Sequence, residues 1–127
     1  MLERQLYEYA VIRVVPRVER EEFLNVGVVL YCRSQKYLEA VYLLDHERLA
    51  AFCNTCNAAE IETYLSAFKN ICRGKGDAGP ISLLPDAARF RWLTATRSTV
   101  VQTSKTHPGL CIDPSVMLQK LFKDLVA

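Results

Sequence analysis

The sequence of 127 residues has no apolar run long enough to cross a membrane. Its longest such run is Val26–Cys32, whereas a spanning helix needs about 20 apolar residues. The first residues, Met-Leu-Glu-Arg-Gln, include an acid and no apolar segment, so no secretory signal is expected. Half of the residues are apolar and 24% are charged, which excludes a disordered or fibrous chain. We expect a small soluble protein, with residues 1–127 forming a single domain in the cytoplasm.

The five cysteines do not form a recognisable metal-binding framework. Their number is odd, and without an export signal reduced thiols are expected. Cys53-Asn-Thr-Cys56 is a CxxC pair, which can bind zinc or exchange a disulfide, but a structural zinc ion needs two more ligands. The other candidate ligands, which would have to converge from distant positions, are His46, Cys72, His107 and Cys111. The alternative is that Cys53 packs under a short helix and Cys56 lies in a turn. We therefore expect no metal and no cofactor.

The familiar motifs of catalysis and nucleotide binding are also missing. The chain has no Gly-x-Ser-x-Gly, no Walker loop and no Rossmann fingerprint. Nucleophilic catalysis needs a nucleophile, a base and an orienting group, and the only imidazoles are His46 and His107. The spacing from His107 to Cys111 matches no nucleophile motif, which favours a turn histidine and a buried thiol. The sequence therefore favours a protein without enzymatic activity.

Acidic residues are absent from the stretch between Ala87 and Ile112. The net charge of the chain is +2, but residues 1–68 carry −3 and residues 69–107 carry +5. A basic segment on a nearly neutral protein suggests a local preference for anions and not a general coat for nucleic acid. The alternative is that these cations pair with the acidic N-terminal half.

The first third of the chain predicts three strands. Leu6–Val15 alternates with period two and ends at Pro16, which cannot donate to a strand ladder. Phe23–Cys32 is apolar on both sides and so is expected at the centre of a sheet, with Gly27 marking a bulge or a close approach of another backbone. Tyr37–Leu44 is the third strand, and short connections favour an antiparallel meander.

The middle of the chain predicts helices. Asp45 is expected to cap a short helix over His46–Phe52. Asn57 begins a capping box, which opens a longer helix over Ala58–Cys72 with an apolar face. Gly74 is expected at the C-cap of this helix.

The last part of the chain predicts a loop, a strand and a helix. Residues 74–86 are expected to form the loop, and Arg89–Thr94 is ambiguous between strand and helix. Ser98–Ser104 predicts a short strand, followed by a turn at His107-Pro-Gly. Asp113 is expected to cap the last helix, which has Pro114 at its first position.

These elements predict an α+β fold. The mainly antiparallel sheet would consist of the N-terminal three-stranded meander plus a later strand. Helices, including the long middle helix and the C-terminal helix, are expected to cover one face of it.

Two segments are candidate binding sites. The first places arginines, acids and an amide at one end of the predicted sheet, and its candidate residues are Arg13, Arg20, Glu22 and Asn25. Arginine is suited to bidentate grips on carboxylate or phosphate. The alternative is an internal lattice of ion pairs, in which Arg20 pairs with Glu22 and Asn25 satisfies loop backbone.

The second segment alternates arginine with aromatic residues and continues into a stretch rich in hydroxyls. Its candidate residues are Arg91, Trp92, Arg97, Ser98 and Gln102. This alternation is typical of a surface that stacks bases and contacts phosphates. The alternative is plain amphipathic alternation, with Phe90 and Trp92 in the core and the arginines in solvent.

The strings Tyr9–Pro16, Arg20–Leu30 and Phe90–Ser104 resemble a bacterial family known as domain of unknown function 3037. The resemblance spans nearly the whole chain and implies a stand-alone bacterial protein of about this length. Thr96 stands where the family is expected to have proline, which leaves the turn before Arg97 less rigid. Relatives are often encoded beside kinases resembling the HipA toxin, so the resemblance implies an accessory role with such a kinase as partner. It identifies no catalytic residue.

The leading hypothesis is a non-enzymatic accessory module that binds a protein partner, an anionic ligand such as phosphate or a nucleotide, or both. The first alternative is an enzyme acting on a phosphate substrate or nucleic acid, with Glu22 as general base. Its charge clamp would consist of Arg13, Arg20, Arg91 and Arg97. The second alternative is a weak nucleic-acid-binding protein that uses Arg91 and Trp92. The oligomeric state is left open between monomer and homodimer. These hypotheses differ in whether the two segments meet in space.

Overall fold

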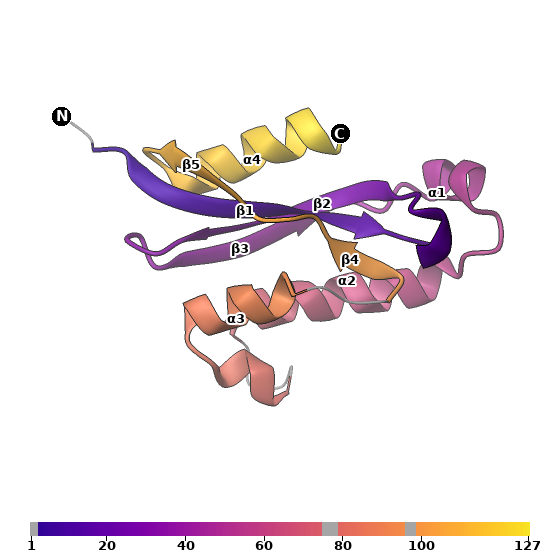
Figure 1. Ribbon diagram of the computed structural model, residues 1–127, viewed down its shortest axis with the longest axis horizontal. Helices are drawn as coiled ribbons and strands as arrows, with labels where there is room; N and C mark the ends of the chain where they lie inside the picture. The colour runs from indigo at the N-terminus through magenta and orange to yellow at the C-terminus, as the bar shows by residue number, and fades with distance from the viewer. Residues whose placement is uncertain (1–2, 75–78, 96–98) are drawn as a thin grey trace.

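An antiparallel sheet forms the centre of the computed structural model, which describes residues 3–74, 79–95 and 99–127 (Figure 1). Its five strands are β1 (Gln5–Val14), β2 (Leu24–Cys32), β3 (Tyr37–Tyr42), β4 (Val101–Thr103) and β5 (His107–Cys111). The order is β3-β2-β1-β4, and β5 pairs with the other end of β1. The predicted α+β class and the predicted N-terminal meander are confirmed.

Helices pack on both faces of this sheet (Figure 1). The helices are α1 (His46–Phe52), α2 (Ala58–Arg73), α3 (Asp86–Leu93) and α4 (Pro114–Leu125), with 3-10 turns η1 (Val18–Arg20) and η3 (Pro80–Leu83). The prediction that helices cover one face was wrong. Strand β2 is apolar on both sides, so Val29 contributes to the core under α2 and α3 while Val28 contributes to the core under α4. Among the described residues, no helix is long and apolar enough to span a bilayer.

A bulge in β2 sets which side chains face α4. Ile12 pairs with Gly27 but Arg13 pairs with Asn25, so Val26 is the extra residue in the ladder. The alternation along β2 therefore shifts by one residue at this point. Val26 lies in the core under α2, and the Asn25 side chain instead donates to the carbonyl of Leu125 at 3.3 Å. The bulge predicted around Gly27 is confirmed.

The predicted caps of the two middle helices are confirmed. The Asp45 carboxylate accepts from the backbone N–H groups of Glu47 and Arg48, and the Asn57 side chain accepts from the N–H of Glu60. Gly74 ends α2 in the left-handed conformation, at a φ of 70°, which glycine adopts without strain. The helix itself ends at Arg73, one residue later than predicted.

The segment predicted as a loop over 74–86 contains a 3-10 turn at Pro80–Leu83, and the ambiguous stretch after it is helical. The stretch belongs to α3, in which Arg89 reaches back one turn to Asp86 with Nη2–Oδ1 at 2.7 Å. Phe90 is buried, but Trp92 is 37% exposed, so the interpretation that placed both aromatics in the core was wrong for Trp92. Strand β4 is shorter than predicted, and residues 96–98 lie outside the described residues.

The turn predicted at His107-Pro-Gly was wrong, because these residues begin strand β5. They pair with Tyr9, Glu8 and Tyr7 of β1. Proline is tolerated on an edge strand, where its missing N–H breaks no ladder bond. A Cβ at Gly109 would lie 2.5 Å from the Tyr7 ring, so glycine allows this ring to cover the strand. Composition alone indicates a turn here, whereas the contact with β1 selects a strand.

The cap of α4 gives the first prediction. The Asp113 carboxylate accepts from the N–H groups of Ser115 at 2.9 Å and Val116 at 3.5 Å, and hydrogen bonds from Ser115 lower its pKa. We expect Asp113→Ala to lower the thermal midpoint by a few degrees at neutral pH. The pKa of Asp113 is lower in the folded than in the unfolded protein. The stabilisation by the Asp113 carboxylate is therefore fully present above the unfolded pKa and is lost as the pH falls through the folded pKa. The thermal midpoints of the parent protein and of Asp113→Ala should therefore approach each other as the pH is lowered. Asp113→Asn should still cap the helix, but without this pH dependence. A constant difference at every pH would contradict the assignment.

Candidate functional site

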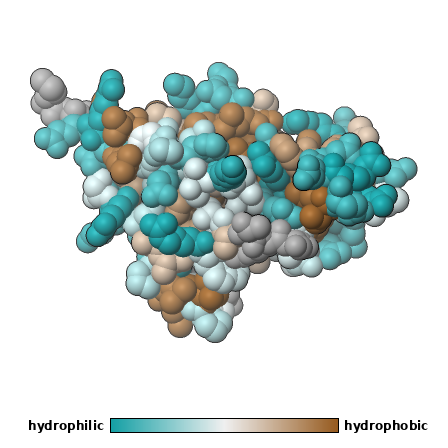
Figure 2. Space-filling view, viewed as in Figure 1, coloured by the Kyte–Doolittle hydropathy of each residue, from teal (hydrophilic) through white to brown (hydrophobic). Residues whose placement is uncertain are grey.

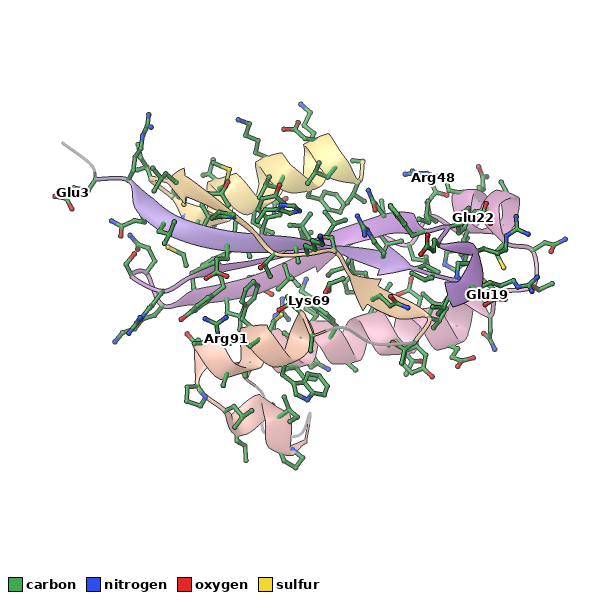
Figure 3. The ribbon with its side chains drawn as sticks, viewed as in Figure 1. Glu3, Glu19, Glu22, Arg48, Lys69 and Arg91 are labelled. Atoms are coloured by element: carbon green, nitrogen blue, oxygen red, sulfur yellow. The ribbon has the colours of Figure 1, made fainter. Side chains whose placement is uncertain are left out.

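Glu22 of the first predicted segment and Arg91 of the second lie far apart in the structure (Figure 3). Glu22 lies beside α1 at one end of the molecule, together with Glu19, and Arg91 lies on α3 toward the other end. Arg97 and Ser98 fall outside the described residues. The arrangement therefore does not bring Glu22 and Arg91 into one clamp.

The charges around η1 neutralise one another. Arg20 forms an ion pair with Glu22, as the lattice interpretation predicted, and Arg17 pairs with Glu19 at 2.8 Å. All four side chains are exposed to solvent. The other half of that interpretation was wrong, since Asn25 donates to α4 and not to loop backbone.

Arg13, Asn25 and Gln102 do come together, as direct neighbours on β1, β2 and β4. The Arg13 guanidinium lies 3.8 Å from the centroid of the Phe23 ring, and burial lowers its pKa. Gln102 donates to the carbonyl of Thr99 at 2.8 Å. Arg13 Nε and Asn25 Oδ1 are buried without a hydrogen-bond partner within the described structure. Arg13, Asn25 and Gln102 therefore form a partly buried polar cluster on the sheet, in which the Phe23 ring covers the Arg13 guanidinium.

Arg91 and Trp92 line different cavities. Successive residues of a helix are turned by about 100° about its axis, so neighbours in α3 do not share a face. Trp92 lines a cavity of about 240 Å³ between α2, α3 and β4, together with Phe68 and Gln102. Arg91 lines another cavity. The two side chains therefore do not form one surface for stacking a base and holding its phosphate.

Three arginines line one open cavity of about 780 Å³ at the end of the β2–β3 hairpin. Arg4 precedes β1, Arg33 lies in the hairpin turn, and Arg91 comes from α3. We call this hollow the arginine cavity. Its other lining residues are Gln5, Leu6, Tyr7, Glu8, Tyr31, Ser34 and Ala87. The described lining therefore includes three arginines and a single acidic residue, Glu8.

These three arginines differ from the other arginines that the structure describes. Of the nine arginines that the structure describes, six are engaged within the molecule. Four pair with carboxylates, Arg48 donates to the carbonyl of Val126, and Arg13 lies over Phe23. The guanidinium groups of Arg4, Arg33 and Arg91 make no ion pair or hydrogen bond with any described residue. An anion placed in the arginine cavity would therefore displace no partner among the described residues.

Sequence reasoning found Arg91 but missed Arg4 and Arg33. The predicted meander could have indicated that Arg4 and Arg33 lie close together. Antiparallel pairing places the start of the first strand beside the end of the second. In the structure Glu8 pairs with Tyr31, which places the residues before β1 near the turn after β2. The contribution of α3 could not be foreseen, because its packing position depends on the whole core.

The cysteine pair lines a separate cavity of about 630 Å³ near α1, together with Arg17 and Arg20. Cys53 and Cys56 are neighbours, with Sγ atoms 2.7 Å apart. No group of three or more potential metal ligands comes together among the residues that the structure describes. The absence of bound zinc stays a prediction, which elemental analysis of protein purified without chelator would check.

The fold and the site together define an α+β protein with an antiparallel sheet between helices and an arginine-lined cavity at one end. A family model described as "Protein of unknown function (DUF3037)" matches residues 9–126, and the chain belongs to that family. Searches of curated proteins and of solved structures found no match.

Proposed function

We propose that the chain is a non-enzymatic binding module whose arginine cavity holds an anionic group of a protein partner. The observation that carries this proposal is the convergence of Arg4, Arg33 and Arg91, which have no partners in the described structure, on one hollow. Guanidinium groups form paired, charge-assisted hydrogen bonds with carboxylate or phosphate. The arginine cavity would provide a binding site for the anionic ligand expected from the basic segment, although two of the three arginines lie outside that segment.

An exposed apolar surface next to the cavity favours a protein as the source of the anion. Leu6 lines the arginine cavity and is 62% exposed, and its cross-strand partner Leu110 is 56% exposed. Arg4 also lines a second open hollow with Ile112 and Val116. Figure 2 shows apolar surface among hydrophilic surface at the end of the molecule where the chain begins. Apolar contacts next to cations suit an acidic peptide with apolar side chains better than free phosphate.

The edge strand β5 offers a way to hold such a peptide. It pairs with β1 on one side, and no described strand pairs with its other side. An extended segment can add to an open sheet edge through main-chain hydrogen bonds, with side chains providing specificity. The family resemblance supplies one class of partner, a kinase similar to the HipA toxin, and supports it by association alone.

The two alternatives gain no support from the geometry. A clamp with Glu22 as general base would need Arg91 near Glu22, but the two lie toward opposite ends of the molecule. Glu22 is also held by Arg20. A base-stacking surface would need Arg91 and Trp92 side by side, but they line different cavities.

A ligand panel tests this proposal. An extended peptide of alternating glutamate and leucine is expected to raise the thermal midpoint, whereas inorganic phosphate should act only weakly. At ten times its Kd a ligand stabilises the fold by about 1.4 kcal/mol. The shift should shrink at high ionic strength, because the contacts are between exposed charges. Replacing Arg33 and Arg91 together by glutamine is expected to abolish it.

Arg17→Gln is the matched control, since Arg17 is exposed but paired with Glu19. It is expected to leave the peptide shift unchanged. If phosphate or a short oligonucleotide gives the larger shift, the protein-partner assignment is wrong and a free anion or nucleic acid takes its place. If the double variant binds the peptide as well as the parent chain does, the arginine cavity is not the binding site.

A further inference from the structure

The connection between α1 and α2 brings two free thiols into contact. Cys53 is the C-cap of α1 and Cys56 precedes Asn57, the N-cap of α2. Their Sγ atoms are 2.7 Å apart, whereas a disulfide bond is about 2.05 Å long. Bonding of the two sulfurs therefore requires a movement of less than about 1 Å. The two sulfurs are therefore already close to bonding distance.

The two thiols differ in their readiness to ionise. The Cys56 thiol donates to Cys53 Sγ, and this hydrogen bond lowers the pKa of Cys53, with a smaller contribution from Thr55. Burial raises the pKa of Cys56 to about 11, and the hydrogen bond to Cys53 adds to this shift. Cys53 is therefore the thiol of the pair that loses its proton first, and Cys56 holds its proton more firmly. Thiolates are the nucleophiles in disulfide exchange, so Cys53 is suited to attack and Cys56 to resolve.

Access also separates this pair from the other cysteines. Cys53 and Cys56 both line the open cavity near α1 and are only partly buried. Cys32, Cys72 and Cys111 are buried in the two cores. Burial also raises the pKa of both Cys72 and Cys111. Cys32 and Cys72 are 0% and 1% exposed, and Cys111, which lines the open hollow that also contains Ile112 and Val116, is 4% exposed. A dissolved disulfide therefore reaches the CxxC pair far more readily than the other three thiols.

We propose that Cys53 and Cys56 form a thiol–disulfide exchange site that takes a low-molecular-weight disulfide as its oxidant. In the first step Cys53 loses its proton to solvent and the resulting thiolate attacks one sulfur of that disulfide; the old S–S bond breaks, and one thiolate leaves. In the second step Cys56 loses its proton to solvent and attacks Cys53 Sγ, which expels the second thiolate. The leaving thiolates take up protons from water. The protein dithiol is thus oxidised by two electrons, and the small disulfide is reduced to two thiols.

Glutathione disulfide is the probe for this site. Native protein incubated with it is expected to lose the mass of two hydrogens and to yield a Cys53–Cys56 peptide after digestion without reductant. Cys56→Ser is expected to stop after the first step and to gain the mass of one glutathionyl group on Cys53. Cys53→Ser is expected to react far more slowly, because the remaining thiol has a raised pKa.

Cys56→Ala provides the matched control for the hydrogen bond. It removes the donor to Cys53, whereas serine keeps one, so Cys53 should react more slowly in Cys56→Ala than in Cys56→Ser at neutral pH. Alkylation of the folded protein should label Cys53 first and leave the three buried thiols unlabelled. An unchanged mass in the parent chain, or Cys53 reacting no faster than the buried thiols, would overturn the proposal. Either result would leave the arginine cavity untouched, since no residue lines both cavities.

Discussion

Gly27→Ala is expected to destabilise the protein by more than about 3 kcal/mol, beyond the usual effect of overpacking. A Cβ at this position would lie 2.6 Å from the Val41 carbonyl oxygen and 2.8 Å from Tyr42 Cβ. Gly27 and Tyr42 are direct partners in the β2–β3 ladder, so the clash is between backbones and no rotamer change relieves it. The loss of unfolded-state entropy with alanine favours folding by only ~0.4–1 kcal/mol. The steric clash therefore outweighs the entropic gain, and the substitution lowers the free energy of unfolding.

Urea denaturation of the two proteins measures this difference as a shift of the transition midpoint. Gly109→Ala is the matched control, because its added Cβ meets the Tyr7 ring, which is a side chain on an edge pair. Its loss of stability is expected to be smaller, since a side-chain ring can move where a backbone carbonyl held in a strand ladder cannot. Equal losses for the two variants would show that the backbone contact at Gly27 is not the determining feature.

Local signals were sufficient to predict the strands of the meander and the helix caps. Asp45, Asn57 and Asp113 each stand before an apolar periodic segment and each accepts from the first turn of its helix. These interactions join residues two or three apart, so the sequence contains both partners in one short window. Gly27 was recognised for a similar reason, since glycine within an apolar strand commonly marks a bulge or a close backbone.

Features that depend on distant partners could not be predicted in this way. The residues from His107 to Gly109 have the composition of a turn, and only their pairing with β1 makes them a strand. The core under α4 forms because strand β2 is apolar on both sides. The local sequence pattern of β2 does not indicate which helix covers which side. The arginine cavity draws Arg4, Arg33 and Arg91 from three separate elements. Its formation requires the register of the meander and the packing of α3 together.

Phe90 is the residue by which α3 is held to the core. Its side chain is 1% exposed, and its ring centroid lies 5.4 Å from that of Tyr31 in β2. Helix α3 has eight residues, and a helix this short is not stable in water without tertiary packing. Arg91 follows Phe90 directly, so the position of this arginine in the cavity depends on the same contact. The packing of Phe90 thus connects fold stability with the proposed binding site.

Phe90→Ala is expected to destabilise the protein by about 3–5 kcal/mol, because it removes a buried ring and leaves a cavity beside Tyr31. The change should be visible in urea denaturation and, where the variant stays folded, as weaker binding of the acidic peptide. Phe90→Leu fills most of the space and should recover most of both losses. Phe52→Ala, at a phenylalanine that is 36% exposed, serves as the control and should change stability much less. If Phe90→Leu recovers stability but not peptide binding, α3 is positioned by the aromatic contact itself; if Phe90→Ala changes neither, α3 is held to the sheet by other residues.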